Sequence, residues 1–332
     1  MKGYIERLIA GKDLGAAEME QAFEHIMSGQ VPDVQIGAFL VALRAKGEKP
    51  DEIAAAARIM RAKALHVEVG EDVVDTCGTG GDGASTFNIS TAVAFVLAGA
   101  GFKVAKHGNR SVSSSSGSAD CLEALGVPIN LGPDEAARAI RAKGFAFLFA
   151  PGYHPSMKYA MPARKQLGIK TVFNILGPLS NPAMAAYQLI GVFSRDLIMP
   201  MIETLKILGL KGAMVVHGGI DEVCVVRPTE YARLAEGRIT TGTIVPQELG
   251  LCVQTLDELR VGTPQESARL IEAVFRGEKK GACRESILIN AGAAFMTLGA
   301  AQDIRSGMAL AGAVIDDGAA LAALNRVKHL ER

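Results

Sequence analysis

Apolar residues near the start of the chain recur three and four positions apart, which is the spacing of one face of an α-helix. Phe23, Ile26 and Met27 are one such set, and similar sets occur throughout residues 3–64. The polar stretches between them carry glycines that suit the left-handed ends of helices. The pattern predicts a small all-helical subdomain over residues 1–66.

Two acidic residues mark expected helix starts in this subdomain. Asp33 and Asp51 each precede an apolar periodic stretch. A short side-chain oxygen can accept a hydrogen bond from an unpaired backbone N–H group at a helix start. We therefore expect both residues to be N-caps.

Beyond Val73 the pattern changes to short apolar runs separated by helical stretches. This alternation predicts a larger α/β domain over residues 67–332 with a mostly parallel central sheet, and it places ligands at the carboxyl ends of the strands. A segment near residues 165–182, rich in Pro and Gly, is expected to cross between the two parts. The expected strands lie near residues 73–74, 103–105, 145–149, 189–193 and 213–216, and the expected helices include 119–126, 134–143 and 196–209.

The composition limits the partners of such a protein. Its 332 residues are 49% hydrophobic with a formal net charge of +0, so no overall field attracts nucleic acid or an anionic membrane. The five cysteines are scattered without a Cys-x-x-Cys pair, which indicates reduced thiols. The N-terminus lacks a signal-peptide pattern, and no apolar run is long enough to span a membrane. We expect a cytoplasmic protein that acts on small molecules, without nucleic-acid or membrane partners.

A glycine-rich stretch follows the first expected strand. Residues 77–83 read Cys-Gly-Thr-Gly-Gly-Asp-Gly, and residues 85–91 then open an apolar helix. Glycines let backbone N–H groups turn toward a ligand, and a helix N-terminus adds partial positive charge, so this order favours a phosphate site. Ser90 and Thr91 can add hydroxyl groups. A tight turn without a ligand is the alternative, which the density of polar side chains disfavours.

The same glycines satisfy a second motif. Gly78, Gly80 and Gly83 match G-x-G-x-x-G, the fingerprint of dinucleotide-binding enzymes. That interpretation requires an acidic residue about 20 positions later to hold a ribose diol. The next strand leads instead into Lys106 and Arg110, which favours an anion site over a nicotinamide-dependent oxidoreductase.

A second candidate loop, residues 106–118, combines these cations with many serines. A flexible linker is the alternative, but linkers seldom lie within one short strand-to-helix connection. Two anion-binding loops on successive strands predict a diphosphate ligand, with this loop covering the phosphates.

Further charged residues follow later strands. Asp221 and Glu222 come after an apolar run and a glycine turn. Carboxylates suit Mg²⁺ that is also bound to phosphates, although a solvated acidic pair is the commoner explanation for two such residues alone. Arg164 either clamps a substrate carboxylate with its planar guanidinium or lies on a solvated helix face.

These motifs occur together, in the same order and at the same spacing, in one known family. The set resembles the anthranilate phosphoribosyltransferase family over nearly the whole chain. The resemblance rests on residues 78–82 (Gly-Thr-Gly-Gly-Asp), 88–91 (Asn-Ile-Ser-Thr), 106–109 (Lys-His-Gly-Asn), 117–126 (Gly-Ser-Ala-Asp-Cys-Leu-Glu-Ala-Leu-Gly), 154–155 (His-Pro), 164 (Arg), 173–179 (Phe-Asn-Ile-Leu-Gly-Pro-Leu), 181–182 (Asn-Pro) and 221–222 (Asp-Glu).

The resemblance implies a fold, an activity and an assembly. The fold is a helical subdomain hinged to an α/β domain of the nucleoside phosphorylase and phosphoribosyltransferase type, with homodimers formed through the helical part. The activity is the Mg²⁺-dependent conversion of anthranilate and phosphoribosyl diphosphate to phosphoribosyl-anthranilate in tryptophan biosynthesis.

The resemblance also assigns roles to residues, matched motif by motif. Phosphoribosyl diphosphate would contact Gly78, Gly81, Asp82, Thr86, Asn88, Ile89, Ser90, Thr91, Lys106, His107, Gly108, Asn109, Arg110, Ser111, Val112, Ser113, Ser114 and Ser118. Anthranilate would contact Gly78, Asn109, Arg164, His107, Pro151 and His154. Magnesium would be held by Ser90, Asp221 and Glu222.

Three departures from the family pattern bear on these roles. Ser115 replaces a common lysine, Lys170 replaces a common arginine, and the turn at Asp221 and Glu222 is shorter than usual. Two rival functions stay open at this point. One is a pyrimidine nucleoside phosphorylase of similar architecture, and the other is a non-catalytic relative that binds nucleic acid.

Overall fold

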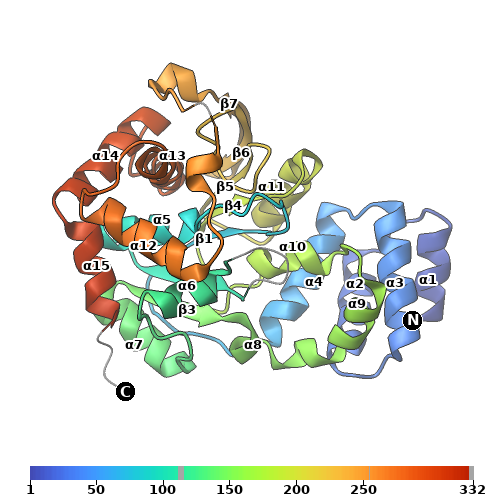
Figure 1. Cartoon of the computed structure of the whole chain (residues 1–332). Helices are drawn as coiled ribbons and strands as arrows, with labels where there is room; N and C mark the ends of the chain where they lie inside the picture. The colour runs from blue at the N-terminus through green and yellow to red at the C-terminus, as the bar shows by residue number, and fades with distance from the viewer. Residues whose placement is uncertain (111–115, 254, 329–332) are drawn as a thin grey trace.

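The computed structural model describes residues 1–110, 116–253 and 255–328 of the chain. Two parts are visible in Figure 1, a small helical part that contains the N-terminus and a larger part built on a β-sheet. The α-helices are α1 (Lys2–Ile9), α2 (Ala16–Met27), α3 (Asp33–Lys46), α4 (Pro50–Ala62), α5 (Ile89–Gly99), α6 (Ser118–Ala124), α7 (Pro133–Lys143), α8 (Ala150–Tyr153), α9 (Met161–Leu167), α10 (Phe173–Leu179), α11 (Ile198–Ile207), α12 (Pro264–Phe275), α13 (Ala282–Thr297), α14 (Ile304–Asp316) and α15 (Ala319–Lys328). The strands are β1 (Val74–Gly78), β2 (Val104–Gly108), β3 (Phe145–Phe149), β4 (Tyr187–Gly191), β5 (Gly212–His217), β6 (Thr229–Ala235) and β7 (Arg238–Ile244).

Helices α1 to α4 form the helical part, and later residues complete its core. Phe23 of α2 is buried with its ring centroid 6.3 Å from that of Phe39 and 5.6 Å from that of Phe173. Phe173 begins α10, more than a hundred residues further along the chain. Helix α9 packs against α3, while α10 packs against both α4 and β2.

The two expected N-caps were wrong by one or two positions. Asp33 is the first residue of α3, whose N-cap is Pro32, and Asp51 is the second residue of α4, whose N-cap is Lys49. In α4 the ring of Pro50 fixes φ at a helical value and so starts the helix one residue earlier. Both aspartates lie in the first turn, where a negative charge interacts favourably with the helix dipole.

The sheet has seven strands in the order β3-β2-β1-β4-β5-β6-β7. The first five are parallel, and β6 and β7 continue the sheet as an antiparallel hairpin. The expected mostly parallel sheet, flanked by helices, is therefore confirmed, and the five expected strands correspond to β1 to β5. The β6–β7 hairpin was not foreseen.

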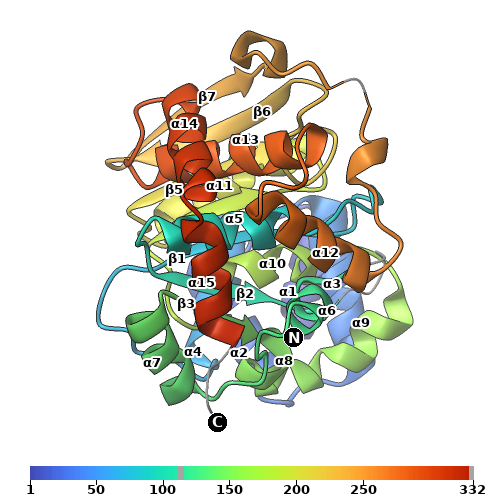
Figure 2. The same ribbon diagram turned by 60° about the vertical axis from the view of Figure 1, so that its left-hand side comes forward.

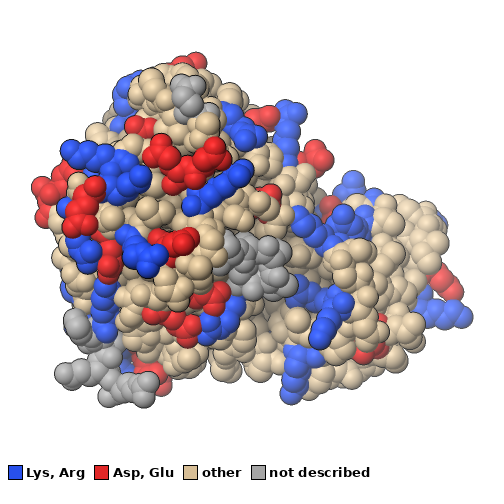
Figure 3. All heavy atoms as spheres, in the orientation of Figure 1, with Lys and Arg blue, Asp and Glu red and all other residues tan. Residues whose placement is uncertain are grey.

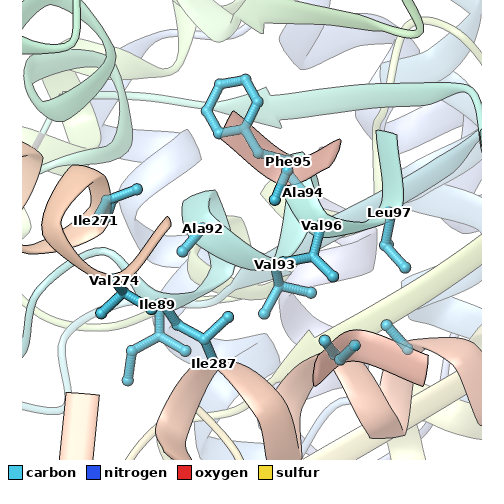
Figure 4. Packing of buried hydrophobic residues seen from close by; sticks show 14 of the residues in the cluster. Ile89, Ala92, Val93, Ala94, Phe95, Val96, Leu97, Ile271, Val274 and Ile287 are labelled. Atoms are coloured by element: carbon cyan, nitrogen blue, oxygen red, sulfur yellow. The ribbon is translucent and has the colours of Figure 1, made fainter. Parts of the chain in front are cut away.

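Helices cover both faces of the sheet, and the strand residues alternate between them. In β5, Met214 and Val216 belong to the core beneath α5 and α13, whereas Ala213 and Val215 belong to the core shared with α11 and the helical part. Figure 2 views the first face, which α5, α13, α14 and α15 cover. Figure 4 shows α5 surrounded by apolar side chains, including Ile271 and Ile287.

The two parts are connected by chain segments and by backbone hydrogen bonds. Beyond α4, the N–H group of Leu65 donates to the carbonyl oxygen of Tyr153 at 2.9 Å, and that of Val67 donates to Pro182 at 3.1 Å. The Nε of Arg61 donates to the carbonyl oxygen of Leu179 at 2.7 Å. Residues 153–182 therefore contact the start of the α/β part as well as the helical part.

Within the described ranges, no single helix is long and apolar enough to cross a membrane. In the part of the chain that the structure describes, α14 and α15 together are long and apolar enough, but a bend of 60° separates them.

Candidate functional site

The glycine-rich stretch forms the expected turn between β1 and α5. Gly80, Gly81 and Gly83 have φ values of 68°, 76° and 73°. Side chains other than glycine rarely adopt this left-handed region. The turn leads to Asn88, the N-cap of α5, so the N–H groups at the start of that helix face the same end of the sheet.

Two paired glycines make room for the acidic turn after β5. Gly78 and Gly191 are register partners at the ends of β1 and β4. A Cβ atom on Gly78 would lie 2.9 Å from Cγ of Asp221, and one on Gly191 would lie 3.0 Å from Cα of Asp221 and closer still to its carbonyl group. Any side chain at these positions would push Asp221 away from the glycine turn.

Because of this close approach, Asp221 and its neighbour hydrogen-bond the phosphate-site candidates directly. The N–H group of Gly80 donates to Oδ2 of Asp221 at 2.8 Å, and the N–H group of Asp221 donates to Oδ2 of Asp82 at 3.2 Å. The N–H group of Ser90 donates to Oε1 of Glu222 at 3.2 Å. The structure thus brings the predicted metal ligands Ser90, Asp221 and Glu222 together.

Burial makes the charged forms of these carboxylates unfavourable. The pKa of Asp221 is raised to about 7, first by burial and then by the nearby charge of Asp82. Burial and the charge of Asp221 raise the pKa of Glu222 well above its usual value. A divalent cation would offset both effects, and the available oxygen donors suit Mg²⁺.

No group of three His, Cys, Asp or Glu side chains could hold a metal ion by itself in the described part of the chain. Mg²⁺ usually keeps several waters and is bound through one or two carboxylates plus the phosphates of a substrate. The residues therefore fit a magnesium ion that arrives with a diphosphate better than a permanently bound metal.

Lys106 of β2 lies in the interior beside these groups. Its side chain is 1% exposed, and its Nζ donates to the carbonyl oxygen of Thr76 and to Oγ of Ser90, the latter at 3.2 Å. Burial lowers the pKa of Lys106, while the nearby Asp75 opposes that change. Lys106 thus brings positive charge to the end of the glycine turn where Ser90 lies.

Asp75 is a buried part of this site that the sequence motifs did not single out. Its carboxylate accepts hydrogen bonds from the N–H group of His107 at 3.2 Å and from Nδ2 of Asn181 at 2.8 Å. Burial raises the pKa of Asp75 to about 6. An acidic residue within an apolar strand was a signal that could have identified it.

A cavity of about 580 Å³ lies where the helical part meets the carboxyl ends of the strands. Met60 of α4 and Met161 of α9 line one side of it, and Gly78 and Gly108 line the other. All six predicted anthranilate-site residues line this cavity, namely Gly78, His107, Asn109, Pro151, His154 and Arg164.

His107 and His154 contact each other in this cavity. Their Nε2 atoms are 3.2 Å apart, and Nδ1 of His107 lies 3.2 Å from the carbonyl oxygen of Gly177. Since a carbonyl oxygen can only accept, Nδ1 of His107 donates and Nε2 of His154 donates to His107. Burial lowers the pKa of His107 to about 3 and that of His154 to about 4, so both rings are neutral near pH 7.

Arg164 brings an unneutralised positive charge to the cavity. Its guanidinium lies 5.1 Å from the ring centroid of Phe173, and Nη1 lies 3.6 Å from Sδ of Met161. Among the described residues, no carboxylate lies within ion-pair distance of it. Burial lowers the pKa of Arg164, yet the group stays cationic at neutral pH.

Other predicted phosphate-site residues are placed less simply. Arg110 binds both carboxylate oxygens of Glu123 and also Asp120, so its guanidinium faces α6. Thr91 is fully buried, and Oγ of Ser118 donates to the carbonyl oxygen of Asn109 at 3.2 Å. The predicted residues Ser111, Val112, Ser113 and Ser114, like the unusual Ser115, lie outside the described residues.

Lys170, one of the three departures from the family pattern, lies against the glycine turn. Its Nζ donates to the carbonyl oxygen of Gly81 at 3.0 Å and lies 3.5 Å from the ring centroid of Phe193. A cation at this position therefore holds the turn through a backbone oxygen.

Comparison with known proteins identifies the family to which this architecture belongs. A glycosyl transferase family matches in two pieces, its helical bundle domain over residues 2–64 and its a/b domain over residues 70–321. An anthranilate phosphoribosyltransferase of Moorella thermoacetica is 49% identical over 327 residues, covering 98% of this chain and 96% of the relative. The chain belongs to the anthranilate phosphoribosyltransferase family.

Solved structures of anthranilate phosphoribosyltransferases share the whole fold. The Thermus thermophilus protein superposes with a TM-score of 0.92 at 41% identity, covering 98% of each chain. The Saccharomyces cerevisiae protein, in complex with PRPP (phosphoribosyl diphosphate) and Mg, has a TM-score of 0.90 at 28% identity and covers 98% of this chain and 96% of that one. The yeast protein in complex with 4-fluoroanthranilate has a TM-score of 0.88 at 27% identity, with the same coverage. The predicted family and fold class are therefore confirmed.

The glycine pair gives the first prediction. We expect Gly191→Ala to destabilise the protein by about 1 to 3 kcal/mol, because the new methyl group overlaps the backbone of Asp221. Urea unfolding of the full chain measures this change. Gly3→Ala is the control, since a Cβ there meets nothing within 4 Å. Equal urea midpoints for Gly191→Ala and Gly3→Ala would show that the turn at Asp221 moves to accommodate the methyl group without loss of stability.

The raised pKa of Asp221 gives a second prediction. A carboxyl group whose pKa is higher in the folded state loses stabilising free energy as the pH rises through that value, here about 7. In EDTA, Asp221→Asn should melt higher than the wild type at pH 8 by about 2 to 4 °C, and the difference should vanish near pH 4. Differential scanning fluorimetry across this range measures it, and parallel pH profiles would contradict it.

Proposed function

We propose that this chain transfers the phosphoribosyl group of phosphoribosyl diphosphate to the amine of anthranilate, giving N-(5-phosphoribosyl)anthranilate and diphosphate, in tryptophan biosynthesis. One observation carries the proposal. The glycine turn and the cavity meet at Gly78, which belongs to both, so the two substrates would bind next to each other. The ligands of the yeast relative, PRPP with Mg and 4-fluoroanthranilate, are consistent with this pairing.

The glycine turn would hold the diphosphate. Backbone N–H groups of the turn suit anionic oxygens, and those of Gly80 and Ser90 would exchange their bonds to Asp221 and Glu222 for phosphate oxygens once these carboxylates hold Mg²⁺. Lys106 adds a buried positive charge next to Ser90. Ser90, Asp221 and Glu222 would hold Mg²⁺, which supplies charge neutralisation of the leaving diphosphate when bound. The same donors would stabilise the charge that develops as the bond to the anomeric carbon breaks.

The amine of anthranilate would attack the anomeric carbon, forming the C–N bond as the C–O bond to diphosphate breaks, and the nitrogen would release one proton to water or to the departing diphosphate. No covalent enzyme nucleophile is required, so the chain contributes mainly positioning and electrostatics. The neutral His107–His154 pair lines the cavity without adding charge.

Arg164 would bind the carboxylate of anthranilate, because its half-buried guanidinium lines the cavity and has no carboxylate partner among the described residues. Lys158 also lines the cavity without such a partner, but it is exposed and its Nζ lies over the ring of Tyr159. We expect Arg164→Ala to raise the KM for anthranilate by a factor equivalent to about 1.5 to 3 kcal/mol of lost binding free energy. The effect on the KM for phosphoribosyl diphosphate should be smaller. Steady-state kinetics with each substrate varied in turn measures both. Lys165→Ala, which removes the adjacent exposed cation, is the control. An anthranilate KM that stays the same in both variants would exclude Arg164 from the site.

We propose that residues 1–66 and 67–332 form two domains, and that the segment near 165–182 joins them a second time.

We also propose that two chains associate through the helical domain. Exposed apolar side chains on α1 and α3 support an interface on this domain. Ile9 of α1 is 73% exposed, and Val34 and Val41 of α3 are 78% and 42% exposed. Val34 and Val41 lie seven residues apart, so they share one face of α3.

This surface yields a prediction about assembly. Val34→Glu should convert a dimer to a monomer, because it places a charge in the apolar contact. Size-exclusion chromatography with light scattering measures the molar mass. Met199→Glu on α11 is the control, since Met199 is exposed but lies in the α/β part. A wild-type protein that is monomeric at micromolar concentration would contradict the proposal.

We also propose that the protein works in the cytoplasm, with Mg²⁺ and small molecules as its partners. Cys77, Cys121, Cys224 and Cys283 carry free thiols, which suits a reducing compartment. On the α/β part of the face shown in Figure 3, positive and negative side chains are interspersed, whereas a surface that binds nucleic acid usually has a basic stripe.

The activity is tested with the purified full chain, anthranilate, phosphoribosyl diphosphate and MgCl₂. We expect anthranilate fluorescence to disappear with time and to persist when EDTA replaces Mg²⁺. Parallel reactions with a pyrimidine nucleoside and inorganic phosphate test the phosphorylase alternative, and a gel-shift assay with DNA tests the nucleic-acid alternative. Persistent anthranilate fluorescence together with cleavage of the nucleoside would overturn the proposal.

A further inference from the structure

A segment from the C-terminal third of the chain holds the glycine turn from outside. Thr86 and Arg260 form an antiparallel bridge. The N–H group of Phe87 donates to the carbonyl oxygen of Leu259 at 2.7 Å, and that of Val261 donates to Ser85 at 2.9 Å. Ser85 has a φ of 54°, a left-handed value that side chains other than glycine adopt rarely. The bridge therefore secures a backbone conformation that the loop does not favour alone.

Helix α12, which begins just after this segment, adds a side chain to the same contact. Ser267 is 0% exposed, and its Oγ accepts a hydrogen bond from the N–H group of Asn88 at 2.9 Å. The same hydroxyl donates to Oδ1 of Asn88 at 2.7 Å. Sγ of Cys121 lies 3.4 Å from Ser267 Oγ, and because that hydroxyl hydrogen is already used, the thiol is the donor.

Asn88 also forms hydrogen bonds with Ser116 in the loop of residues 106–118. Ser116 Oγ donates to Oδ1 of Asn88 at 2.6 Å, and Nδ2 of Asn88 donates to the carbonyl oxygen of Ser116 at 3.1 Å. The backbone N–H and the side-chain amide of Asn88 therefore hold this residue against Ser267 and Ser116. One hydroxyl of α12 fixes the residue that joins the glycine turn to the loop containing residue 116.

We propose that Ser267 is a positioning residue for the phosphoribosyl diphosphate site. It touches no reacting atom, and it acts through Asn88 by holding the start of α5 and Ser116 at a fixed separation. The inference rests on the proposed function, because it assumes that these two loops grip one diphosphate. Freeing Asn88 would let the start of α5 and Ser116 shift relative to each other, which weakens binding of this substrate and leaves the anthranilate cavity unchanged.

Ser286 provides a matched comparison. It is also a buried helical serine, 1% exposed, but its Oγ donates to the carbonyl oxygen of Ala282 in its own helix α13 at 2.8 Å. Removing either hydroxyl leaves a similar small defect in the core. Of these two hydroxyls, that of Ser267 links a helix to the candidate site.

The test compares Ser267→Ala with Ser286→Ala by steady-state kinetics. For Ser267→Ala we expect the KM for phosphoribosyl diphosphate to rise about 5- to 10-fold, the equivalent of one net hydrogen bond, with the anthranilate KM and kcat within about twofold of the wild type. Ser286→Ala should change none of these. Ser116→Ala should reproduce part of the effect, and the double variant with Ser267→Ala should fall short of the product of the single effects, because both act through Asn88.

Hydrogen exchange of the substrate-free protein gives a readout that does not depend on activity. The amides around residue 88 should exchange faster in Ser267→Ala and at the wild-type rate in Ser286→Ala. If the wild type lacked the transferase activity while this difference remained, the proposed function would fail and the loop-fixing contact would stand. An unchanged KM for phosphoribosyl diphosphate in both Ser267→Ala and Ser116→Ala would overturn the inference. If Ser267→Ala does not fold, Ser116→Ala decides.

Discussion

The candidate site depends on two glycines that face each other at the ends of neighbouring parallel strands. Without side chains at Gly78 and Gly191, the turn after β5 can cross the ends of β1 and β4 and place Asp221 on the glycine turn. The placement of the proposed metal ligands Asp221 and Glu222 follows from this approach. It brings carboxylates from one part of the sequence against backbone N–H groups from another, more than 130 residues apart.

The approach has an electrostatic consequence. Asp221, Glu222 and Asp82 come together in a partly buried place, where desolvation disfavours the charged forms of Asp221 and Glu222 and raises the pKa of each. Lys106 compensates only in part, since it is itself buried and its own pKa is lowered. Such a site is best satisfied when a cation and an anion enter together, as a metal diphosphate does. The clustered carboxylates therefore lower the stability of the free protein and raise its affinity for a charged ligand.

The sequence predicted the features that local patterns encode. Glycine spacing, apolar runs and family motifs were enough for the helical part, the strands β1 to β5 and the family, all of which the structure and the comparisons confirm. The roles of the individual site residues stay predictions, although the six assigned to anthranilate do line one cavity.

What the sequence did not reveal are contacts between distant residues. The sequence did not show what Asp75 and Ser267 contact, because their partners Asn181 and Asn88 are far away along the chain. The β6–β7 hairpin was missed since most β7 side chains are at least partly exposed and lack a buried apolar run. The helix start at Asp51 was displaced by Pro50, whose fixed φ suits the first helical position, and in α3 the N-cap is Pro32, one residue before Asp33.

The most direct test of this account is calorimetric titration of the full chain with phosphoribosyl diphosphate in the absence of anthranilate, with MgCl₂ or with EDTA. The account predicts saturable binding of one ligand per chain with MgCl₂, much weaker binding with EDTA, and loss of the magnesium dependence when Asp221 and Glu222 are replaced by Asn and Gln. Equal affinity with and without Mg²⁺ in the wild type would contradict it.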